Sequence, residues 1–370
     1  MHIGIDTLGM RIGDTGGLQI YTKELISALA AIDQQNQYTI FVHHDAGDYY
    51  GVSAPNFCYV KCPVSHQYLK LTLLWRNLFF YSFLKQFNID VLHFPANQGV
   101  LFVPCPFVIT VHDAISFKAA SSVTAFYDRK FWQGAIRRGA MQSSYVITVS
   151  ETSKTDILEH IRIPEGKIKV IYNGLPSFML SPPKFLPSMS QSYILWVGRT
   201  ASHKNLIRLI QAYHFLVNKK GLGHLLYLVG MKGTYYSKII EKVKELGLKQ
   251  HIMFIENPSF SQLKSFYEKA SLFVFPSLIE GFGLPLLEAM SCGTPVVASN
   301  CSAPKEISGD AAYFVDPEDV EDIADGMWQV LNDSSLRQRL IEKGYIRAKQ
   351  FSWENCALQT VKIYEKVVQS

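Results

Sequence analysis

The feature that most constrains this chain is the alternation of short apolar runs with amphipathic stretches along almost its whole length. In the first half the apolar runs are HIGID, YTIFVHH, DVLHF, FVITVHD, YVITVS and KIKVIYN. Continuous runs of about four to eight residues, rich in Val, Ile and Tyr, are typical of strands buried on both faces. The stretches between them, such as residues 20–31, have helical periodicity. The alternation predicts parallel sheets with right-handed crossover helices.

The alternation is interrupted once. Residues 177–191 lie in the segment SFMLSPPKFLPSMSQS, whose many prolines and serines predict a linker. The pattern then restarts with YILWVG, LLYLVG, IMFIE, LFVFPS, PVVAS and AAYFVD. We therefore expect an α/β protein with two Rossmann-like domains, over residues 1–176 and 192–351. The last stretch, residues 352–370, predicts a helix that crosses back and completes the first domain.

Length and composition set further limits. A chain of 370 residues that is 48% hydrophobic and 18% charged has enough apolar surface for two cores. Its net charge of +5 does not indicate a nucleic-acid binder, and is compatible with anionic ligands or lipid surfaces. The six cysteines form no CxxC pair, which favours reduced thiols. With no signal peptide and no apolar span of roughly 18 residues, we expect a cytoplasmic protein that is not integral to the membrane.

Two glutamates, Glu280 and Glu288, flank a segment that contains Gly281, Gly283 and Pro285. Proline is favoured at the first position of a helix, so Glu280 should lie in a loop and Glu288 at the end of the first helical turn. Free N–H groups at such a helix start bind anions such as phosphate, and a neighbouring carboxylate suits the vicinal hydroxyls of a ribose. The simpler alternative is a pair of surface acids that stabilise the helix dipole.

The segment EGFGLPLLEAMSCGTPVVASN, residues 280–300, resembles the E-x7-E signature of retaining glycosyltransferases of family 4. The resemblance continues in order through TGGLQIYTKELISAL, VITVHDAISF, VITVSETSKTDI, KVIYNGL, WVGRTASHKNLIRLIQAY and SLFVFPSLIEGFG. It implies the GT-B fold, in which two Rossmann-like domains face each other across a cleft. It also implies transfer of a sugar from a nucleotide-sugar donor with retention of configuration.

The resemblance assigns Arg199 and Lys204 to the donor diphosphate. Both follow the apolar run ILWVG, and fixed cations stabilise a departing diphosphate as a metal would. The only Asp pair of interest, Asp322 and Asp325, has the wrong spacing for an Asp-x-Asp metal motif. We therefore expect no metal and no other cofactor. The alternative, solvated basic residues at a helix start, is disfavoured by the helix dipole.

By the same resemblance, Glu280 reaches the hydroxyls of the donor sugar. The backbone of Phe282, Gly283 and Leu284 would lie beside that sugar, and Glu288 would hold the ribose. The reaction implied is a front-face displacement, in which the acceptor hydroxyl attacks from the side that the diphosphate leaves. The departing phosphate oxygen takes the proton, so no protein base is required. A nucleophilic role for Glu280 in a double displacement remains an alternative.

Three further positions come from the first half of the chain. Gly16 and Gly17 precede a predicted helix, and the resemblance implies close approach of their backbone to the donor. His112 ends the run FVITV and is implied to contact the transferred sugar, with Asp113 beside it; a purely structural histidine is the alternative. The loop before Gly16 is long, which leaves the role of Asp14 open.

Residues 67–87, QYLKLTLLWRNLFFYSFLKQF, are apolar and aromatic, and they contain Lys70, Arg76 and Lys85 but no acid. We favour a core or interdomain helix for this segment. The alternative is a helix that rests on a membrane and admits a lipid-linked acceptor, an arrangement that Arg137 and Arg138 would reinforce.

The favoured function is transfer of mannose from GDP-mannose to a glycan or polyprenyl-linked glycan during cell-surface polysaccharide synthesis. Transfer of glucose or N-acetylglucosamine from a UDP-sugar is the nearest alternative. A nucleotide-sugar epimerase, a glycoside hydrolase that uses Glu280 and Glu288, and a non-catalytic nucleotide-sugar binder are more distant ones. A retaining hydrolase requires its carboxyl groups about 5–5.5 Å apart across the sugar. One glutamate in a loop and one in a helix, with an anion site between them, fit this requirement poorly.

Overall fold

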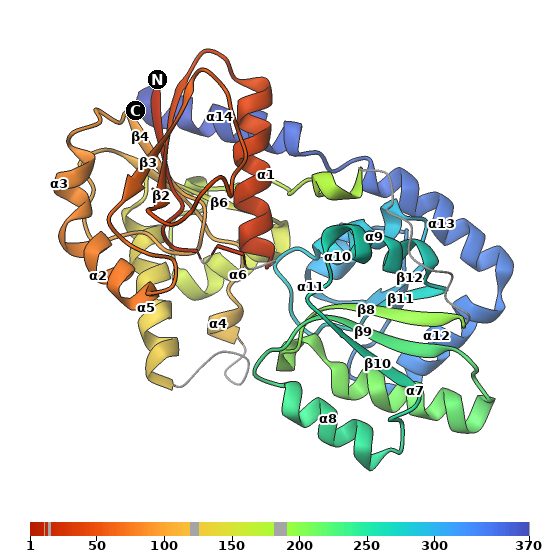
Figure 1. Cartoon of the computed structure of the whole chain (residues 1–370). Coiled ribbons are helices and arrows are strands. Elements are labelled where there is room, and N and C mark those ends of the chain that lie inside the picture. The colour runs from red at the N-terminus through yellow and green to blue at the C-terminus, as the bar shows by residue number, and fades with distance from the viewer. Residues whose placement is uncertain (11, 14–15, 119–125, 181–190, 370) are drawn as a thin grey trace. The chain divides into compact units, whose positions relative to one another are not determined.

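The computed structural model describes the chain except for residues 11, 14–15, 119–125, 181–190 and 370 (Figure 1). Within the described parts, the chain divides into two compact units. Of the described residues, the first unit contains those within 1–118, 126–174 and 352–369, and the second contains 175–180 and 191–351. Most of the predicted linker falls in residues 181–190, outside the described residues. The part that precedes them forms a short 3-10 turn, η2 (Ser177–Met179), whose Met179 packs into the core of the second unit.

The first unit is built on a seven-stranded parallel sheet with the order β3-β2-β1-β4-β5-β6-β7. Its strands are β1 (His2–Asp6), β2 (Gln37–His43), β3 (Phe57–Cys62), β4 (Val91–Phe94), β5 (Phe107–Thr110), β6 (Tyr145–Thr148) and β7 (Ile168–Val170). Its helices are α1 (Gly17–Ile32), α2 (Leu69–Leu78), α3 (Phe80–Leu84), α4 (Ile115–Lys118), α5 (Phe126–Gln142), α6 (Glu151–Ile161), η1 (Glu165–Lys167) and α14 (Trp353–Gln369).

The second unit is built on a six-stranded parallel sheet with the order β10-β9-β8-β11-β12-β13. Its strands are β8 (Tyr193–Arg199), β9 (Leu225–Met231), β10 (Ile252–Glu256), β11 (Leu272–Phe275), β12 (Val296–Ser299) and β13 (Tyr313–Val315). Its helices are η3 (Ser202–Lys204), α7 (Leu206–Lys220), α8 (Tyr236–Glu245), α9 (Phe260–Lys269), α10 (Leu284–Ser291), α11 (Ser302–Ser308), α12 (Val320–Asn332) and α13 (Ser334–Ala348).

Helices cover both faces of the second sheet, with α9 and α10 on one side and α7 and α12 on the other (Figure 1). Two apolar clusters fill the space between helices and sheet. Leu209 of α7 and Ile323 of α12 belong to one cluster, whereas Tyr267 of α9 and Leu286 of α10 belong to the other. Burial on both faces explains why these strands read as continuous apolar runs rather than as alternating ones.

The C-terminal helix α14 packs against α1 in the first unit (Figure 1). Gly174 lies where this helix begins, because a Cβ at that position would stand 2.2 Å from the backbone nitrogen of Trp353. Glycine at position 174 therefore permits a close approach of the two backbone segments. Deeper in the unit, the Tyr364 hydroxyl lies 2.6 Å from Nδ1 of His93 at the centre of the sheet.

The α/β class and the parallel sheets predicted from the apolar runs are confirmed. Strand β3, however, was not among the predicted strands. It lies at the edge of the first sheet, next to β2 alone, and several of its side chains are partly or fully exposed. An edge strand lacks the continuous apolar run on which the prediction relied.

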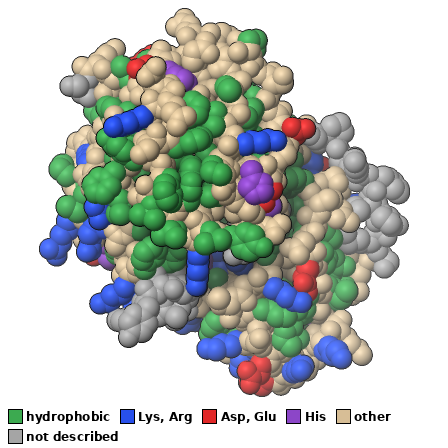
Figure 2. Space-filling view, turned by 60° about the vertical axis from the view of Figure 1, so that its left-hand side comes forward, with side chains coloured by type: hydrophobic (Ala, Val, Ile, Leu, Met, Phe, Trp, Pro, Cys, Tyr) green, Lys and Arg blue, Asp and Glu red, His purple; other side chains and the backbone are tan. Residues whose placement is uncertain are grey.

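The prediction that residues 67–87 form a core helix is wrong for α2. Its leucines at positions 71, 74 and 78 are 56–61% exposed, whereas Thr72 and Arg76 are buried. Figure 2, which brings this part of the unit forward, shows hydrophobic side chains gathered on the surface with Lys and Arg side chains at their margin. Among the described residues, no helix has the length and apolar character required to cross a bilayer.

Candidate functional site

The second unit has a topological switch point between β8 and β11. The chain leaves β8 toward β9 on one side, and β11 is the neighbour on the other side. Loops that follow two such strands diverge, which leaves space at the carboxyl ends of the strands. The loop after β8 contains Lys204, and the loop after β11 contains Glu280. The sheet order therefore brings together two residues that are far apart in the sequence.

Lys204 and Glu280 form an ion pair. The Lys204 Nζ lies 2.5 Å from Oε1 of Glu280, and the two side chains are 17% and 9% exposed. The same ammonium group lies 5.5 Å from the centre of the Phe275 ring. The alternative of a solvated lysine at a helix start is therefore wrong. The ion pair holds the Lys204 ammonium group at the carboxyl edge of the sheet.

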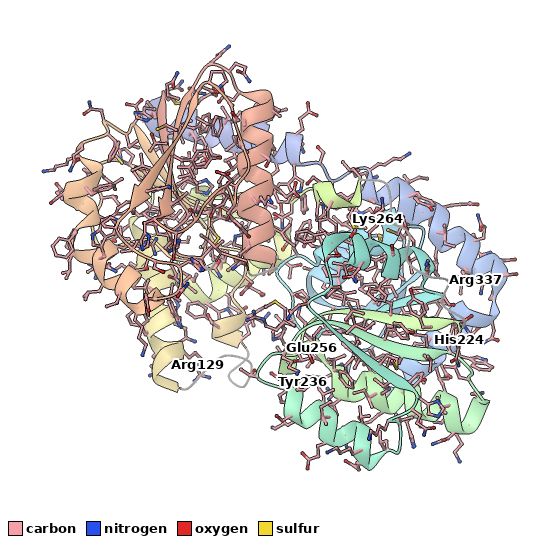
Figure 3. All side chains as sticks on the ribbon, in the orientation of Figure 1. Arg129, His224, Tyr236, Glu256, Lys264 and Arg337 are labelled. Carbon is pink, nitrogen blue, oxygen red and sulfur yellow. The ribbon has the colours of Figure 1, made fainter. Side chains whose placement is uncertain are left out.

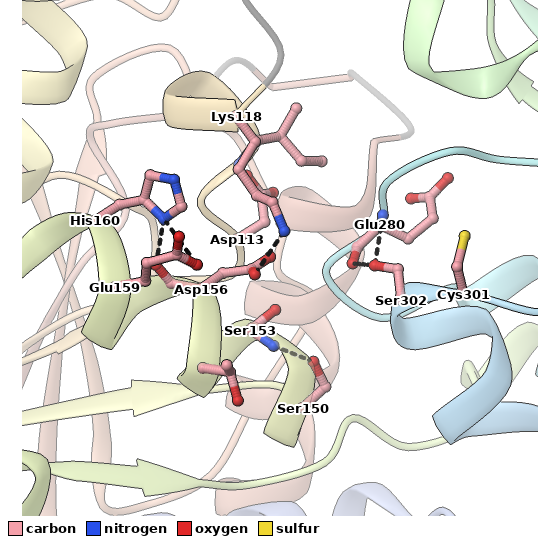
Figure 4. Close-up of polar contacts among 12 residues, drawn as sticks. Asp113, Lys118, Ser150, Ser153, Asp156, Glu159, His160, Glu280, Cys301 and Ser302 are labelled. Carbon is pink, nitrogen blue, oxygen red and sulfur yellow. Dashed lines mark hydrogen bonds and ion pairs between the residues drawn. The ribbon is translucent and has the colours of Figure 1, made fainter.

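Main-chain contacts hold both loops in position. The Leu278 amide donates to the carbonyl of His203 at 2.8 Å, which joins the loop after β11 to η3. The Ser302 hydroxyl donates to the Glu280 carbonyl at 3.2 Å, and the Glu280 amide in turn lies 3.4 Å from that hydroxyl oxygen (Figure 4). Asn205, in a left-handed conformation, donates to the carbonyls of Pro276 and Pro317. These hydrogen bonds thus fix the backbone of both loops that carry Lys204 and Glu280.

Arg199 is the last residue of β8 and is exposed. Its Nη2 lies 3.6 Å from the sulfur of Met231, the residue that ends β9. The structure therefore places Arg199 at the carboxyl edge of the sheet, as the sequence predicts.

Glu288 is buried in the second turn of α10, 3% exposed. The hydroxyl of Tyr267, in α9, donates to its Oε2 at 2.7 Å. Burial raises the pKa of Glu288 from 4.5 to about 7, while the Tyr267 hydrogen bond acts in the opposite direction. The alternative of two surface acids is wrong, because both glutamates are buried and each accepts a hydrogen bond from its own partner.

The start of α10 is shaped by Gly283, which has φ 107° and is the residue before the helix. A Cβ there would lie 2.9 Å from a methyl group of Leu286, so glycine is required both for its conformation and for space. Phe282 and Leu284 are buried, and the Phe282 ring packs edge-on against Phe351. Their side chains therefore serve the core, and only their backbone is available for the role implied above.

A pocket lies at the carboxyl ends of β8, β9 and β10. Gly198 and Gly230 pair there in register, and a Cβ on Gly230 would stand 2.1 Å from the carbonyl oxygen of Gly198. Glycine at position 230 therefore permits the close approach of the two strand ends. The side chains around the pocket include the polar ones of Thr200, Lys232, Tyr236 and Glu256, together with Trp196 and Met231.

Lys232, Tyr236 and Glu256 were not among the predicted site residues. Lys232 Nζ lies 2.7 Å from Glu256 Oε1 and 4.8 Å from the centre of the Tyr236 ring. Tyr236 and Glu256 are neighbours at this end of the sheet (Figure 3). The Trp196 indole N–H, beneath them, is buried and makes no hydrogen bond within the described structure. The signal that was available in the sequence is the glycine at the end of each of two successive strands.

In the first unit, Gly16 and Gly17 begin α1, as the sequence predicts. Gly16 has φ −71°, so its conformation does not require glycine. A Cβ on Gly17 would meet no atom within 4 Å. The packing of the described residues therefore does not explain a glycine at position 17. Asp14 lies outside the described residues.

His112 is buried, and its hydrogen bonds define its tautomer. Nε2 lies 2.8 Å from the carbonyl of Pro95, which can only accept, so Nε2 carries the proton and Nδ1 is the acceptor nitrogen. Burial lowers the pKa of His112 to about 4, so the ring is neutral at pH 7. The Tyr21 ring packs edge-on against it, with ring centres 4.6 Å apart. His112 is thus a neutral group in a fixed orientation.

A chain of hydrogen bonds lies beneath His112. Thr110 Oγ1 lies 2.8 Å from Nε2 of His93 and 3.1 Å from the hydroxyl of Tyr21. His93 is fully buried and also contacts Tyr364, and burial lowers its pKa to about 3. The hydrogen bonds of His93 therefore connect β4 to Thr110 and to Tyr364 of α14 inside the first unit.

Asp113 has a local role in the structure. Its Oδ1 accepts from the Ile115 amide at 3.0 Å, immediately before α4. At the other end of α4, Lys118 forms an ion pair of 2.7 Å with Asp156 of α6 (Figure 4). The segment after His112 is thereby fixed at both ends, while the Ser153 hydroxyl donates to the His112 carbonyl.

Comparison with known proteins agrees with these features. Residues 15–177 match the family described as Glycosyltransferase Family 4, and residues 181–347 match Glycosyl transferases group 1. The O-antigen chain mannosyltransferase B of Escherichia coli is 34% identical over 64% of this chain. The O-antigen chain mannosyltransferase RfbU of Salmonella typhimurium is 32% identical over 57% of this chain. These matches span 64% and 57% of the relatives' own lengths, less than two thirds in each case.

Solved structures share the whole fold. A sucrose-phosphate synthase from Thermosynechococcus elongatus superposes with a TM-score of 0.79 at 22% identity, over 99% of both chains. WaaG, a glycosyltransferase involved in lipopolysaccharide biosynthesis, superposes with a TM-score of 0.74 at 16% identity, over 98% of this chain and 99% of its own. With two parallel-sheet units and both family matches, the chain belongs to glycosyltransferase family 4 and has the GT-B fold.

Proposed function

We propose that this protein is a retaining, metal-independent mannosyltransferase that uses GDP-mannose. The observation that carries the proposal is the Lys204–Glu280 pair at the switch point of the second sheet. In the proposed complex Lys204 turns from Glu280 toward the diphosphate, and Arg199 adds a second positive charge. Glu280 then accepts hydrogen bonds from the hydroxyls of the donor sugar, and Glu288 holds the ribose.

The proposed reaction breaks the bond between the anomeric carbon and the β-phosphate oxygen. The acceptor hydroxyl attacks from the same face, and its proton passes to the departing phosphate oxygen. Lys204 and Arg199 would stabilise the charge that develops on the diphosphate. In other enzymes, removal of one group that stabilises such a charge lowers kcat by about 10²–10³-fold. His112, with Nε2–H engaged by Pro95, would offer Nδ1 as an acceptor to a sugar hydroxyl.

Two observations favour a guanine nucleotide. The two O-antigen relatives are described as mannosyltransferases, at 34% and 32% identity. The ends of β8–β10 also present the paired charges of Lys232 and Glu256, which border a small pocket and are 50% and 42% exposed. Guanine has adjacent N–H donors for a carboxylate and the acceptors O6 and N7 for an ammonium group, whereas uracil has a single N–H donor.

The proposed acceptor is a polyprenyl-linked glycan used in cell-surface polysaccharide synthesis. Support comes from the same relatives, which are described as acting on O-antigen chains. A lipid-linked acceptor would bring the enzyme to the cytoplasmic face of the membrane, where we propose that it acts as a peripheral protein.

The test measures thermal stabilisation and nucleotide release with GDP-mannose, UDP-glucose and UDP-N-acetylglucosamine, with and without chelator. We expect stabilisation by GDP-mannose alone, and turnover that survives EDTA. Glu256→Gln should weaken GDP binding by about tenfold, the loss of one charge-assisted hydrogen bond. Glu241→Gln, an exposed residue of α8, is the matched control. Stabilisation by a UDP-sugar instead would overturn the donor assignment, and turnover abolished by EDTA would overturn metal independence.

A further inference from the structure

Helix α2 has the opposite polarity from an ordinary surface helix. The side chains of Thr72 and Arg76 point into the protein and are 0% and 2% exposed. Leu71, Leu74 and Leu78, three and four residues apart, form its outer face. Surface helices of globular proteins normally bury such a stripe, so this arrangement requires another explanation.

The buried polar face prevents α2 from turning its leucines inward. Arg76 Nε donates to Asp6 Oδ2 at 3.0 Å, and both side chains are almost completely buried. The Thr72 hydroxyl donates to the carbonyl of Ser65 at 3.1 Å. Rotation of the helix would separate Arg76 from Asp6 and leave two buried charges without partners, which is strongly unfavourable. The outward direction of the leucines is therefore a fixed feature of the fold.

The apolar surface extends beyond α2. The Leu101 amide donates to Asn77 Oδ1 at 3.0 Å, so the loop with Leu101 and Phe102 lies beside the helix. We call the resulting surface the α2 patch. It consists of Leu71, Leu74, Leu78, Phe79, Leu101 and Phe102, which are 36–63% exposed. Large exposed side chains gathered in one place indicate an interaction site, unlike scattered ones (Figure 2).

The charged side chains of the segment that carries most of the α2 patch are all basic. Residues 67–87 contain no Asp or Glu, and Lys70 and Lys85 are exposed. Helix α5 lies next to the loop, since a Cβ on Gly99 would stand 3.5 Å from the Cα of Gly139. The residue before that glycine, Arg138, is exposed as well. Tyr68 and Tyr81, also exposed, are residues of the type enriched at membrane–water interfaces.

We propose that the α2 patch docks on an anionic phospholipid bilayer, with the leucines and Phe102 in the interfacial region and the basic residues among the headgroups. A second copy of this chain fits less well. A two-fold contact would bring Lys70 and Lys85 toward their own copies, with no acid in residues 67–87 to pair with them. The proposal rests on the proposed function for its purpose, access to a lipid-linked acceptor.

The test is sedimentation of the full chain with vesicles of phosphatidylcholine, with and without phosphatidylglycerol. We expect binding that requires the anionic lipid and decreases with salt. The double variant Leu71→Glu/Leu78→Glu should lower the partition coefficient by at least about tenfold. Lys70→Gln/Lys85→Gln should lower it by about fivefold for each lysine, on anionic vesicles only. The matched control is Ile346→Glu/Leu358→Glu, at residues that are 64% and 45% exposed on other helices.

Thermal stabilisation by GDP-mannose is measured on the same samples. Loss of vesicle binding in the α2 double variant, with donor stabilisation retained, would support the proposal and show that the variant is folded. Equal vesicle binding by this variant and the control would overturn it. The proposal would also be overturned if the wild-type protein were a dimer, the double variant were a monomer, and neither bound vesicles. Vesicle binding without any response to GDP-mannose would remove the proposed donor and leave the docking surface intact.

Discussion

The candidate site residues of the two units are held by different kinds of interaction. In the first unit, His112 is neutral and is fixed by hydrogen bonds and by the Tyr21 ring. In the second unit, Lys204 and Glu280 form a charged pair. A neutral acceptor with a fixed orientation suits a sugar hydroxyl, whereas an ion pair suits an anionic group that replaces the carboxylate partner. Under the proposed function, His112 would orient a sugar hydroxyl and Lys204 would bind phosphate.

The largest expected effect is that of Lys204→Ala. Loss of the cation should lower kcat/KM by about 10²–10³-fold, because the diphosphate would depart without its stabilising charge. Steady-state nucleotide release measures the change. Lys220→Ala, which removes a lysine over the Trp328 ring at the end of α7, is the matched control. Unchanged turnover in Lys204→Ala would contradict the proposed role of Lys204 in binding the diphosphate.

Acidification should weaken the first unit through its buried histidines. Burial lowers the pKa of His43 and His112 to about 4 and that of His93 to about 3, from 6.5. The unfolded chain then binds more protons, so stability is fully present above pH 6.5 and is lost as pH falls through the folded-state pKa values. We expect a loss of about 1–2 kcal/mol per histidine by pH 5, read from denaturant unfolding. His93→Asn should reduce the change of the free energy of unfolding with pH. An unaltered pH dependence in this variant would contradict the role given to His93.

His112→Leu should lower kcat/KM by about 10–100-fold, the loss of one oriented hydrogen bond to the sugar. Because the ring is neutral above pH 6, the rate of the wild-type enzyme should show no inflection from this residue between pH 6 and 8. His214→Leu, on α7, is the control. A His112→Leu enzyme with full activity would return His112 to a structural role.

Glu288→Gln separates stability from binding in the second unit. Burial raises the pKa of Glu288 to about 7. Its contribution to the free energy of unfolding is therefore fully present below pH 4.5 and is lost as pH rises through about 7. The glutamine variant should therefore be more stable than wild type by about 1–3 kcal/mol at pH 8 and equal to it at pH 4. Donor affinity should fall by about tenfold, because the ribose would meet a neutral amide. The same comparison with Glu241→Gln should show neither change.

The smallest expected effect compares two glycines. Gly17→Ala meets open space at a helix start and should stabilise the first unit by up to about 1 kcal/mol, yet lower turnover if a ligand uses that space. Gly230→Ala would place a Cβ 2.1 Å from the Gly198 carbonyl oxygen, so it should lower both stability and turnover. Thermal unfolding and nucleotide release distinguish the two. Full turnover in Gly17→Ala would argue against a ligand at this position.

Much of the site was accessible from sequence because it follows strand ends. His112, Arg199 and Glu280 each come after an apolar run that forms a buried strand, and parallel sheets gather such residues at one edge. The Lys232–Glu256 pair was missed because each residue alone is an ordinary surface charge. The partner of Glu288 was missed for a similar reason, since Tyr267 lies on a different helix 21 positions away.

The resemblance to family 4 supplied the candidate site residues, whereas the apolar runs by themselves determined the parallel α/β class and the repetition of the pattern. These depend on local hydrophobic periodicity and on glycine and proline, which act over a few residues. Tertiary structure alone decided the Lys204–Glu280 pairing, the raised pKa of Glu288 and the outward face of α2. Each depends on burial or on a partner distant in the chain, as when Arg76 meets Asp6 and turns three leucines toward solvent.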